Sequence, residues 1–98
     1  MDFDILLYRV PLGKVDYPRP CVVIASPDFQ LLNISTKQYA NFNYFVIPHH
    51  HPDFATTGLT ETSYVLGAPI ISGEQKYVIK KLGKLTGELA REFSDWIG

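Results

Sequence analysis

The sequence predicts a mainly β protein, a small barrel of about five to seven short strands followed by one C-terminal helix. Two observations predict this class. Runs rich in Val, Ile, Tyr and Phe, each closed by Pro or Gly, occupy roughly the first 80 residues, and the apolar spacing becomes helical only near the end. The 98 residues fit a single domain over 1–98. A core this small makes the pairing of two copies a natural way to bury more apolar surface.

Two strands are predicted on either side of a proline-containing loop. The first covers residues 3–10 and ends before Pro11, because a proline disfavours helix at the residue before it and cannot donate to a sheet. We expect a loop over residues 11–20, whose breakers are Pro11, Gly13, Pro18 and Pro20. The continuous apolar run from Cys21 to Ser26 then predicts a central strand buried on both faces, with an inert buried thiol.

The middle of the chain predicts more strands around a long loop. Residues 31–36 and 42–47 read as strands that form a hairpin. Residues 48–58 show no periodicity, and a loop of this length in a small domain is more often functional than not, so it is the predicted site loop. Short extended pieces are predicted at 63–66, 70–71 and 77–81.

The last segment predicts an amphipathic helix with Thr86 as its N-cap. Its apolar positions follow the helical period, so they share one face: Leu89, Ala90, Phe93, Trp96 and Ile97. Charged residues take the other face. We expect the aromatic side of this helix to pack on the barrel.

Charge and cysteine content limit the classes of function. Nine Lys plus Arg against ten Asp plus Glu give a formal charge of −1, so a nucleic-acid site has to be a local patch. The single Cys21 excludes an intrachain disulfide and a cysteine-based metal cluster. Asp2 and Asp4 stand where an export signal is basic, and no apolar run approaches the ~18–20 residues of a membrane span. We expect a soluble cytoplasmic protein without a membrane partner.

Histidines in the predicted site loop are the first candidates for chemistry. His side chains titrate nearest neutral pH and are common metal ligands. In extended backbone, His49 and His51 share a face that His50 does not, and a metal would need a further ligand such as Asp53. Solvated surface histidines remain an equally good interpretation of this run.

Cationic residues form the second group of candidates. Arg19 lies between Pro18 and Pro20, which stiffen the backbone, and its planar guanidinium suits bidentate contact with a phosphate. On spacing alone, a surface arginine in a turn is the preferred interpretation. A dense basic cluster with an interleaved aromatic side chain follows later in the chain: Lys76, Tyr77, Lys80, Lys81 and Lys84. Such a stripe can follow a single-stranded backbone while the aromatic ring stacks on a base, although a solvated strand face has the same pattern.

Three stretches, taken in order, resemble a known family. They are the strand Asp4-Ile5-Leu6-Leu7 with a Gly-containing loop and the run Arg19-Pro20-Cys21-Val22-Val23-Ile24; the stretch from Gly58-Leu59 to Ser63-Tyr64-Val65-Leu66; and Lys81-Leu82-Gly83-Lys84-Leu85-Thr86 before the helix. The chain resembles the MazF/PemK family of toxin endoribonucleases, the toxin half of bacterial type II toxin–antitoxin pairs. The resemblance spans nearly the whole chain.

This resemblance implies an SH3-like β-barrel that pairs as a homodimer, binds a cognate antitoxin protein and cleaves single-stranded RNA without a metal or other cofactor. In that reaction the 2′-hydroxyl attacks the adjacent phosphate, which requires a base, an acid and a cation. Arg19 matches the family's Arg-Pro position and is the expected cation. The family places a Thr or Ser after a Val-Ile-Pro strand, and His50 stands nearest that position here.

Further residues complete the predicted site. Ser63 is the third catalytic candidate, although it lacks the Gly-x-Ser-x-Gly context of a hydrolase nucleophile. The expected RNA-binding residues are Lys76, Tyr77, Lys80 and Lys81.

Two alternatives stay open from the sequence. Ala68, Pro69 and Ile71 stand where the family often has an Asp-Gln-x-Arg run, so a catalytically silent SH3-like barrel that binds protein or nucleic acid as a dimer is the second hypothesis. A small metal-dependent enzyme that uses His49, His51 and Asp53 is the third.

Overall fold

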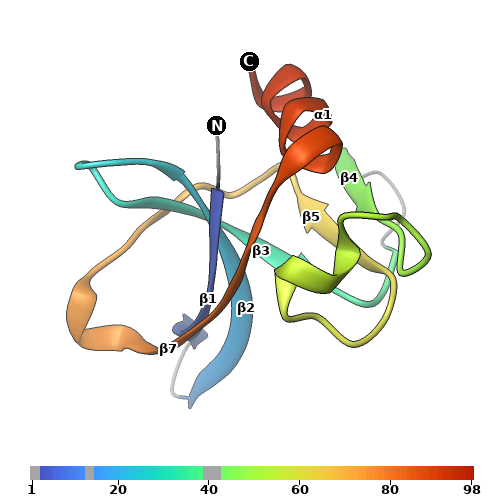
Figure 1. Ribbon diagram of the computed structural model, residues 1–98. Helices are drawn as coiled ribbons and strands as arrows, with labels where there is room; N and C mark the ends of the chain where they lie inside the picture. Colours follow the sequence, from blue (N-terminus) through green and yellow to red (C-terminus); the bar gives the residue numbers. More distant parts are fainter. Residues whose placement is uncertain (1–2, 13–14, 39–42) are drawn as a thin grey trace.

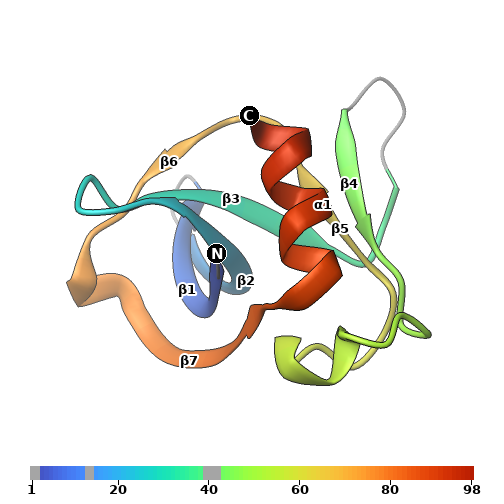
Figure 2. The same cartoon turned by 45° about the horizontal axis from the view of Figure 1, so that its top comes forward.

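A computed structural model describes residues 3–12, 15–38 and 43–98. In this part of the chain seven strands form one antiparallel sheet in the order β4-β5-β3-β2-β1-β7, and β6 pairs with β3. The sheet curls strongly, and helix α1 lies across one end of it (Figures 1 and 2). The mainly β class with a single C-terminal helix is confirmed. Among the described residues β4 and β7 end the strand order and do not pair with each other, so the barrel is open.

The elements are short and follow one another with brief connections. The strands are β1 (Phe3–Leu12), β2 (Val15–Ala25), β3 (Gln30–Ser35), β4 (Tyr44–Ile47), β5 (Ser63–Leu66), β6 (Ile71–Ser72) and β7 (Val78–Leu85). Two 3-10 turns, η1 (Phe54–Thr57) and η2 (Gln75–Tyr77), precede β5 and β7, and α1 covers Gly87–Ile97.

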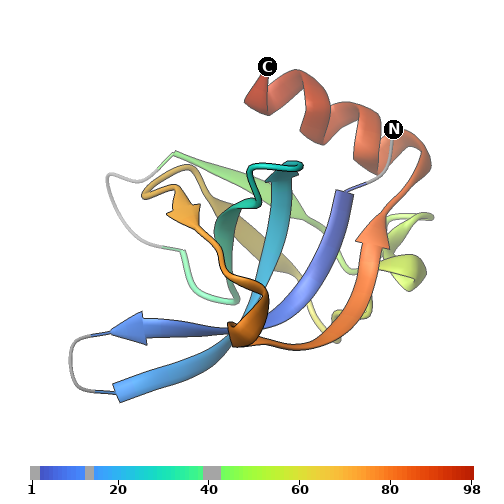
Figure 3. The same cartoon turned by 90° about the vertical axis from the view of Figure 1, so that its left-hand side faces the viewer.

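A long β1–β2 hairpin takes the place of the loop predicted over residues 11–20. β1 continues through Pro11 and pairs with β2 along this whole length, and the hairpin projects from the sheet (Figure 3). Pro18 and Pro20 are two residues apart, so their backbone nitrogens, which carry no hydrogen, face the same side of β2. Pairing with β3 begins only at Cys21, so the missing donors interrupt no ladder on that side. The loop prediction was wrong because these prolines occupy a strand edge.

The predicted hairpin between residues 31–36 and 42–47 is also wrong. Both segments contain strands, β3 and β4, but β5 lies between them and pairs with each. Residues 39–42 of the connection lie outside the described residues. β5 itself begins and ends where the sequence predicts, at Ser63 and Leu66. Which strands become neighbours depends on long-range pairing, here of β5 with both β3 and β4, and the local sequence does not predict such pairing.

Two separate clusters bury the two faces of the sheet. The first packs under the helix and contains Phe3, Ile5, Val22, Leu32, Ile34, Ile47, Val65, Leu85, Leu89, Ala90 and Phe93. The second contains Tyr8, Val10, Cys21 and Leu31. Val22 and Cys21 are consecutive and fully buried in different clusters, which confirms the prediction of a central strand buried on both faces.

Helix α1 buries Leu89, Ala90 and Phe93 of the predicted apolar face, but Ile97 at its C-terminal end stays exposed. Phe93 is its central side chain, in edge contact with Phe3 at 4.9 Å and with Phe45 at 5.2 Å between ring centroids. Thr86 occupies the N-cap position as predicted, but its side chain makes no capping bond. Its hydroxyl instead lies 2.8 Å from that of Thr56, which ties the start of the helix to η1. Within the described ranges, no helix is long and apolar enough to cross a membrane.

Candidate functional site

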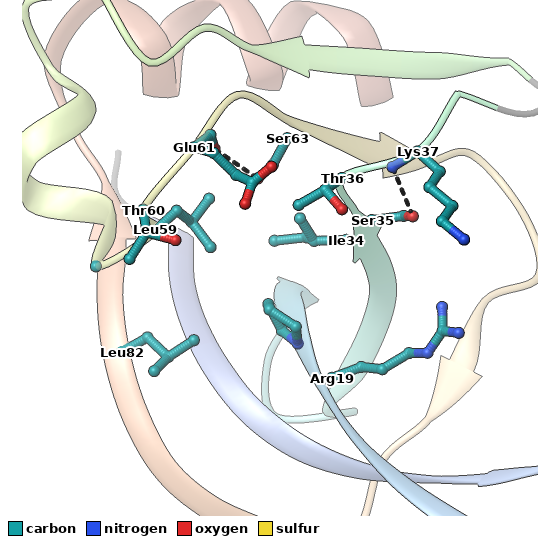
Figure 4. A pocket seen from close by; sticks show the side chains of 12 residues that line it. Arg19, Ile34, Ser35, Thr36, Lys37, Leu59, Thr60, Glu61, Ser63 and Leu82 are labelled. Atoms are coloured by element: carbon teal, nitrogen blue, oxygen red, sulfur yellow. Dashed lines mark hydrogen bonds between the residues drawn. The ribbon is translucent and has the colours of Figure 1, made fainter.

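A pocket of about 370 Å³ opens between the end of β3, the segment that follows η1, and β7 (Figure 4). Its volume falls within the range of roughly 300–1,000 Å³ that is usual for small-ligand sites. Two of the predicted catalytic residues, Arg19 and Ser63, line this pocket. The fold therefore brings together two predicted residues, one cation and one hydroxyl, that lie more than 40 residues apart along the chain.

The register of β2 and β3 explains how Arg19 reaches the end of β3. Cys21 pairs with Asn33 at the last position of this ladder, so Arg19, two residues earlier, lies beside the end of β3, and both Arg19 and Ser35 line the pocket. The backbone N–H of Lys37 then donates to the Ser35 hydroxyl at 3.1 Å, which turns the chain along the pocket rim. Burial raises the pKa of the Cys21 thiol to about 12, and the positive charge of Arg19 opposes this rise. The guanidinium therefore sits at the edge of a buried region.

The opposite wall is the segment 58–63, which lies directly on β7. Gly58 has a φ of +74°, and a Cβ there would collide with the backbone carbonyl of Leu82. A Cβ at Gly83 would collide with the carbonyl oxygen of Thr56. Because both positions lack a side chain, the backbone of residues 56–58 can approach the backbone of β7 closely, and this contact sets the position of the wall.

Internal hydrogen bonds fix the backbone of this wall. The Thr57 hydroxyl donates to the carbonyl of Phe54 at 2.7 Å and accepts from the N–H of Leu59 at 3.1 Å. Ser63 is only 2% exposed, and its hydroxyl donates to the carbonyl of Glu61 at 2.9 Å. The Ser63 hydroxyl proton is therefore already used in this bond, which holds the backbone of Glu61 in place.

Charged side chains without partners surround the pocket. Arg19 and Lys37 extend on one side and Glu61 lies on the other (Figure 4). Over the described ranges, none of these three side chains forms a hydrogen bond or an ion pair. Two cations at one end of a pocket favour the binding of an anion, and the hydroxyl groups of Ser35 and Thr36 lie beside them.

His50, the other predicted catalytic residue, is not among the residues that line the pocket. It is exposed, and its ring lies edge-on to that of His49 with 5.6 Å between centroids. His49 Nδ1 in turn lies 2.8 Å from the hydroxyl of Thr62. His50 therefore lies outside the pocket that Arg19 and Ser63 line.

His51 joins the predicted site loop to the helix. Its Nδ1 accepts the backbone N–H of Asp53 at 3.0 Å, and its Nε2 lies 3.4 Å from a carboxylate oxygen of Glu92. Both ring nitrogens thus face protein groups. No group of three His, Cys, Asp or Glu side chains suited to a metal occurs in the described part of the chain. The metal-dependent alternative with His49, His51 and Asp53 has no support in this geometry.

The basic cluster lies on η2 and β7 and lines no part of the pocket: Lys76, Tyr77, Lys80 and Lys81. Lys76 Nζ lies 5.2 Å from the centroid of the Tyr77 ring and 4.0 Å from a carboxylate oxygen of Glu74. Lys81 pairs with Asp4 at 3.1 Å, and Lys80 is exposed. These residues form a surface separate from the Arg19 pocket.

Sequence reasoning missed five polar residues of the pocket: Ser35, Thr36, Lys37, Thr60 and Glu61. A usable signal was the polar stretch that directly follows the apolar strand 31–34, since side chains at strand ends commonly build sites. Comparison of the chain with protein-family models, curated proteins and solved structures finds no match.

Proposed function

We propose that this protein is a MazF/PemK-like toxin that cleaves single-stranded RNA at the Arg19 pocket without a metal. The observation that carries the proposal is the pair of unpartnered cations, Arg19 and Lys37, at one end of a pocket that also presents hydroxyl groups. An RNA phosphate is the anion that this chemistry fits, because a planar guanidinium binds two phosphate oxygens at once.

The cations act on the charge that develops during the reaction. When the 2′-oxygen attacks the phosphorus, negative charge builds on the non-bridging oxygens, and a preorganised guanidinium stabilises it more than it stabilises the bound substrate. Arg19 is half-buried and lies between Pro18 and Pro20, so its backbone loses little freedom on binding. Lys37 supplies a second positive charge.

A hydroxyl beside the arginine also supports the proposal. The resemblance implies a Thr or Ser after a Val-Ile-Pro strand, where this chain has His50, so Thr36 matches it in chemistry and not in sequence position. β3 ends at Ser35, and Thr36 follows in the pocket that Arg19 lines. Thr36 is therefore the better candidate for that role in the proposed toxin.

The partners of the proposed toxin are those that the resemblance implies. It would act in the cytoplasm on single-stranded RNA, pair as a homodimer and be silenced by a cognate antitoxin protein. In a dimer, the exposed Lys76, Lys80 and Lys81 would guide the strand outside the pocket, beside Tyr77, which is half-buried against Tyr8.

Replacement of Arg19 tests the proposed activity. Arg19→Ala should lower the rate of cleavage of end-labelled single-stranded RNA in EDTA by about 10²–10³-fold, the usual loss when a charge-stabilising group is removed. Arg91→Ala, which removes an exposed helix arginine paired with Glu88, is the matched control and should cleave at the wild-type rate. Intact RNA after prolonged incubation with folded wild-type protein would contradict the proposal.

A silent binding module is the second candidate. Ala68, Pro69 and Ile71, where the resemblance expects an acid and a second arginine, are not among the pocket-lining residues, so no acidic residue reaches the pocket from that stretch. A barrel that keeps the anion site without cleavage would retain RNA in a filter-binding assay, lose it with Arg19→Ala, and leave every strand intact.

A further inference from the structure

Cleavage by a 2′-hydroxyl requires a base that accepts its proton, and the pocket presents one candidate. We propose that Glu61 is the general base of the RNA cleavage reaction. This inference rests on the proposed function, and it fills a role for which His50, outside the pocket, is not placed.

The position of Glu61 is the first argument. It is the one acidic residue among those described that line the pocket, and it lies across from Arg19 and Lys37 (Figure 4). A phosphate held by the two cations would place its adjoining ribose toward the facing wall. The base acts on the 2′-hydroxyl and the cations act on the non-bridging phosphate oxygens, so these groups need separate positions around the substrate.

The backbone of Glu61 is held while its carboxylate is free. Ser63, almost fully buried, donates its hydroxyl to the Glu61 carbonyl at 2.9 Å. Gly58 anchors the start of the same segment against the backbone of β7. A fixed backbone with an uncommitted side chain is the arrangement expected of a group that receives a proton.

Most other side-chain carboxylates of the described chain have partners, and the two described ones without a partner, Asp28 and Asp95, do not line the pocket. Asp4 pairs with Lys81, Glu74 with Lys76 and Glu88 with Arg91. Asp53 and Glu92 flank His51. Glu61 lies near two cations yet pairs with neither, which leaves room for a ligand between them.

The proton and electron pairs balance without a further reagent. The O–H bond of the 2′-hydroxyl breaks, and its proton passes to a carboxylate oxygen of Glu61 while the 2′-oxygen forms a bond to phosphorus. The bond from phosphorus to the 5′-oxygen then breaks, and that oxygen keeps the electron pair and takes a proton from water. The products are a 2′,3′-cyclic phosphate and a 5′-hydroxyl, and protonated Glu61 returns its proton to solvent.

The test compares Glu61→Gln with wild type on a labelled RNA oligonucleotide. Glu61→Gln should cleave about 10²–10⁴-fold more slowly, the usual contribution of a general base. It should bind the uncleavable 2′-deoxy oligonucleotide within twofold of the wild-type Kd, which also shows that it is folded. The rise of log rate with pH on the acidic side should disappear. Glu88→Gln, an identical change on the exposed face of α1, should leave rate and pH profile unchanged.

A second substrate separates a base from an acid. In an oligonucleotide whose leaving 5′-oxygen is replaced by sulfur, departure needs no proton, so a lost acid is rescued and a lost base is not. The Glu61→Gln defect should persist on this substrate. Rescue, or cleavage by Glu61→Gln at the wild-type rate, overturns the base role and leaves the proposed ribonuclease standing. If wild type and Arg19→Ala both leave the RNA intact, the proposed function fails and the role of Glu61 fails with it.

Discussion

Cys21 shows how burial determines the chemistry of one side chain. Its thiol is fully buried in the second cluster and donates to the side-chain oxygen of Asn33 at 3.6 Å. Burial raises its pKa to about 12, because a thiolate would lose its hydration, and the nearby charge of Arg19 opposes that rise only in part. The group stays protonated at neutral pH and is no nucleophile for the pocket.

The raised pKa predicts an alkaline loss of stability. An unfolded thiol releases its proton near pH 9, and the folded one releases it only near 12, so the unfolded state holds fewer protons between these values. The contribution of Cys21 to the free energy of unfolding is therefore complete below pH 9 and declines as the pH rises toward 12. Urea titrations of wild type and Cys21→Ala should converge over this window, since the other titrating groups cancel. Parallel curves would contradict the prediction.

The start of helix α1 depends on a residue far away in the chain. The backbone N–H of Leu89 donates to a carboxylate oxygen of Asp53 at 3.4 Å, which places a negative charge at the positive end of the helix. Gly87 precedes it with a φ of +56°, and a Cβ there would lie 2.8 Å from the same carboxylate. Helix, turn η1 and site loop are thus joined at one point.

Gly87→Ala should lower the free energy of unfolding by about 1–3 kcal/mol, because alanine is strained at a positive φ and its methyl group would crowd Asp53. In an Asp53→Ala background the cost should be smaller, since only the strain remains. Urea denaturation of the four variants of this cycle measures the coupling. Glu88→Ala, at the next exposed position, should change stability by a few tenths of a kcal/mol. Equal costs in both backgrounds would exclude contact with Asp53 as a cause.

Elements with a clear spacing of apolar residues were predictable from the sequence, but the pairing of strands with one another was not. The helix face of Leu89 and Phe93 follows from spacing, and the double burial of Cys21 and Val22 follows from a continuous apolar run. The β1–β2 hairpin was missed because a proline on a strand edge has the same sequence signature as one in a loop. The place of β5 between β3 and β4 depends on long-range pairing, which no local pattern contains.

The residues of the candidate site likewise include some that local sequence predicts and some that it does not. Arg19 was predictable because its flanking prolines and planar cation are local features. Glu61 and Lys37 were not, since their significance comes from facing Arg19 across a pocket that three distant segments build. His50 attracted attention by residue type, and its position beyond β4 separates it from that pocket.

Over the whole molecule, the pocket depends on how the segment around η1 docks on the curled sheet. β7 is the sheet edge that receives it, and Gly83 pairs with Ile5 of β1 on its other side. The same glycine leaves space for the carbonyl of Thr56. Stability and site geometry are therefore linked at this contact, because any side chain at Gly83 displaces the wall that carries Glu61.

Gly83→Ala should lower the free energy of unfolding by about 1–3 kcal/mol, the usual cost of overpacking a tight contact, and reduce RNA cleavage under conditions where the variant is still folded. The methyl group would meet backbone atoms of η1, which cannot rotate away as a side chain can. Urea denaturation and the labelled-RNA assay measure both effects. Ile79→Ala, at an exposed position of the same strand, should spare cleavage. Full activity in a destabilised Gly83→Ala protein would show that the wall tolerates displacement.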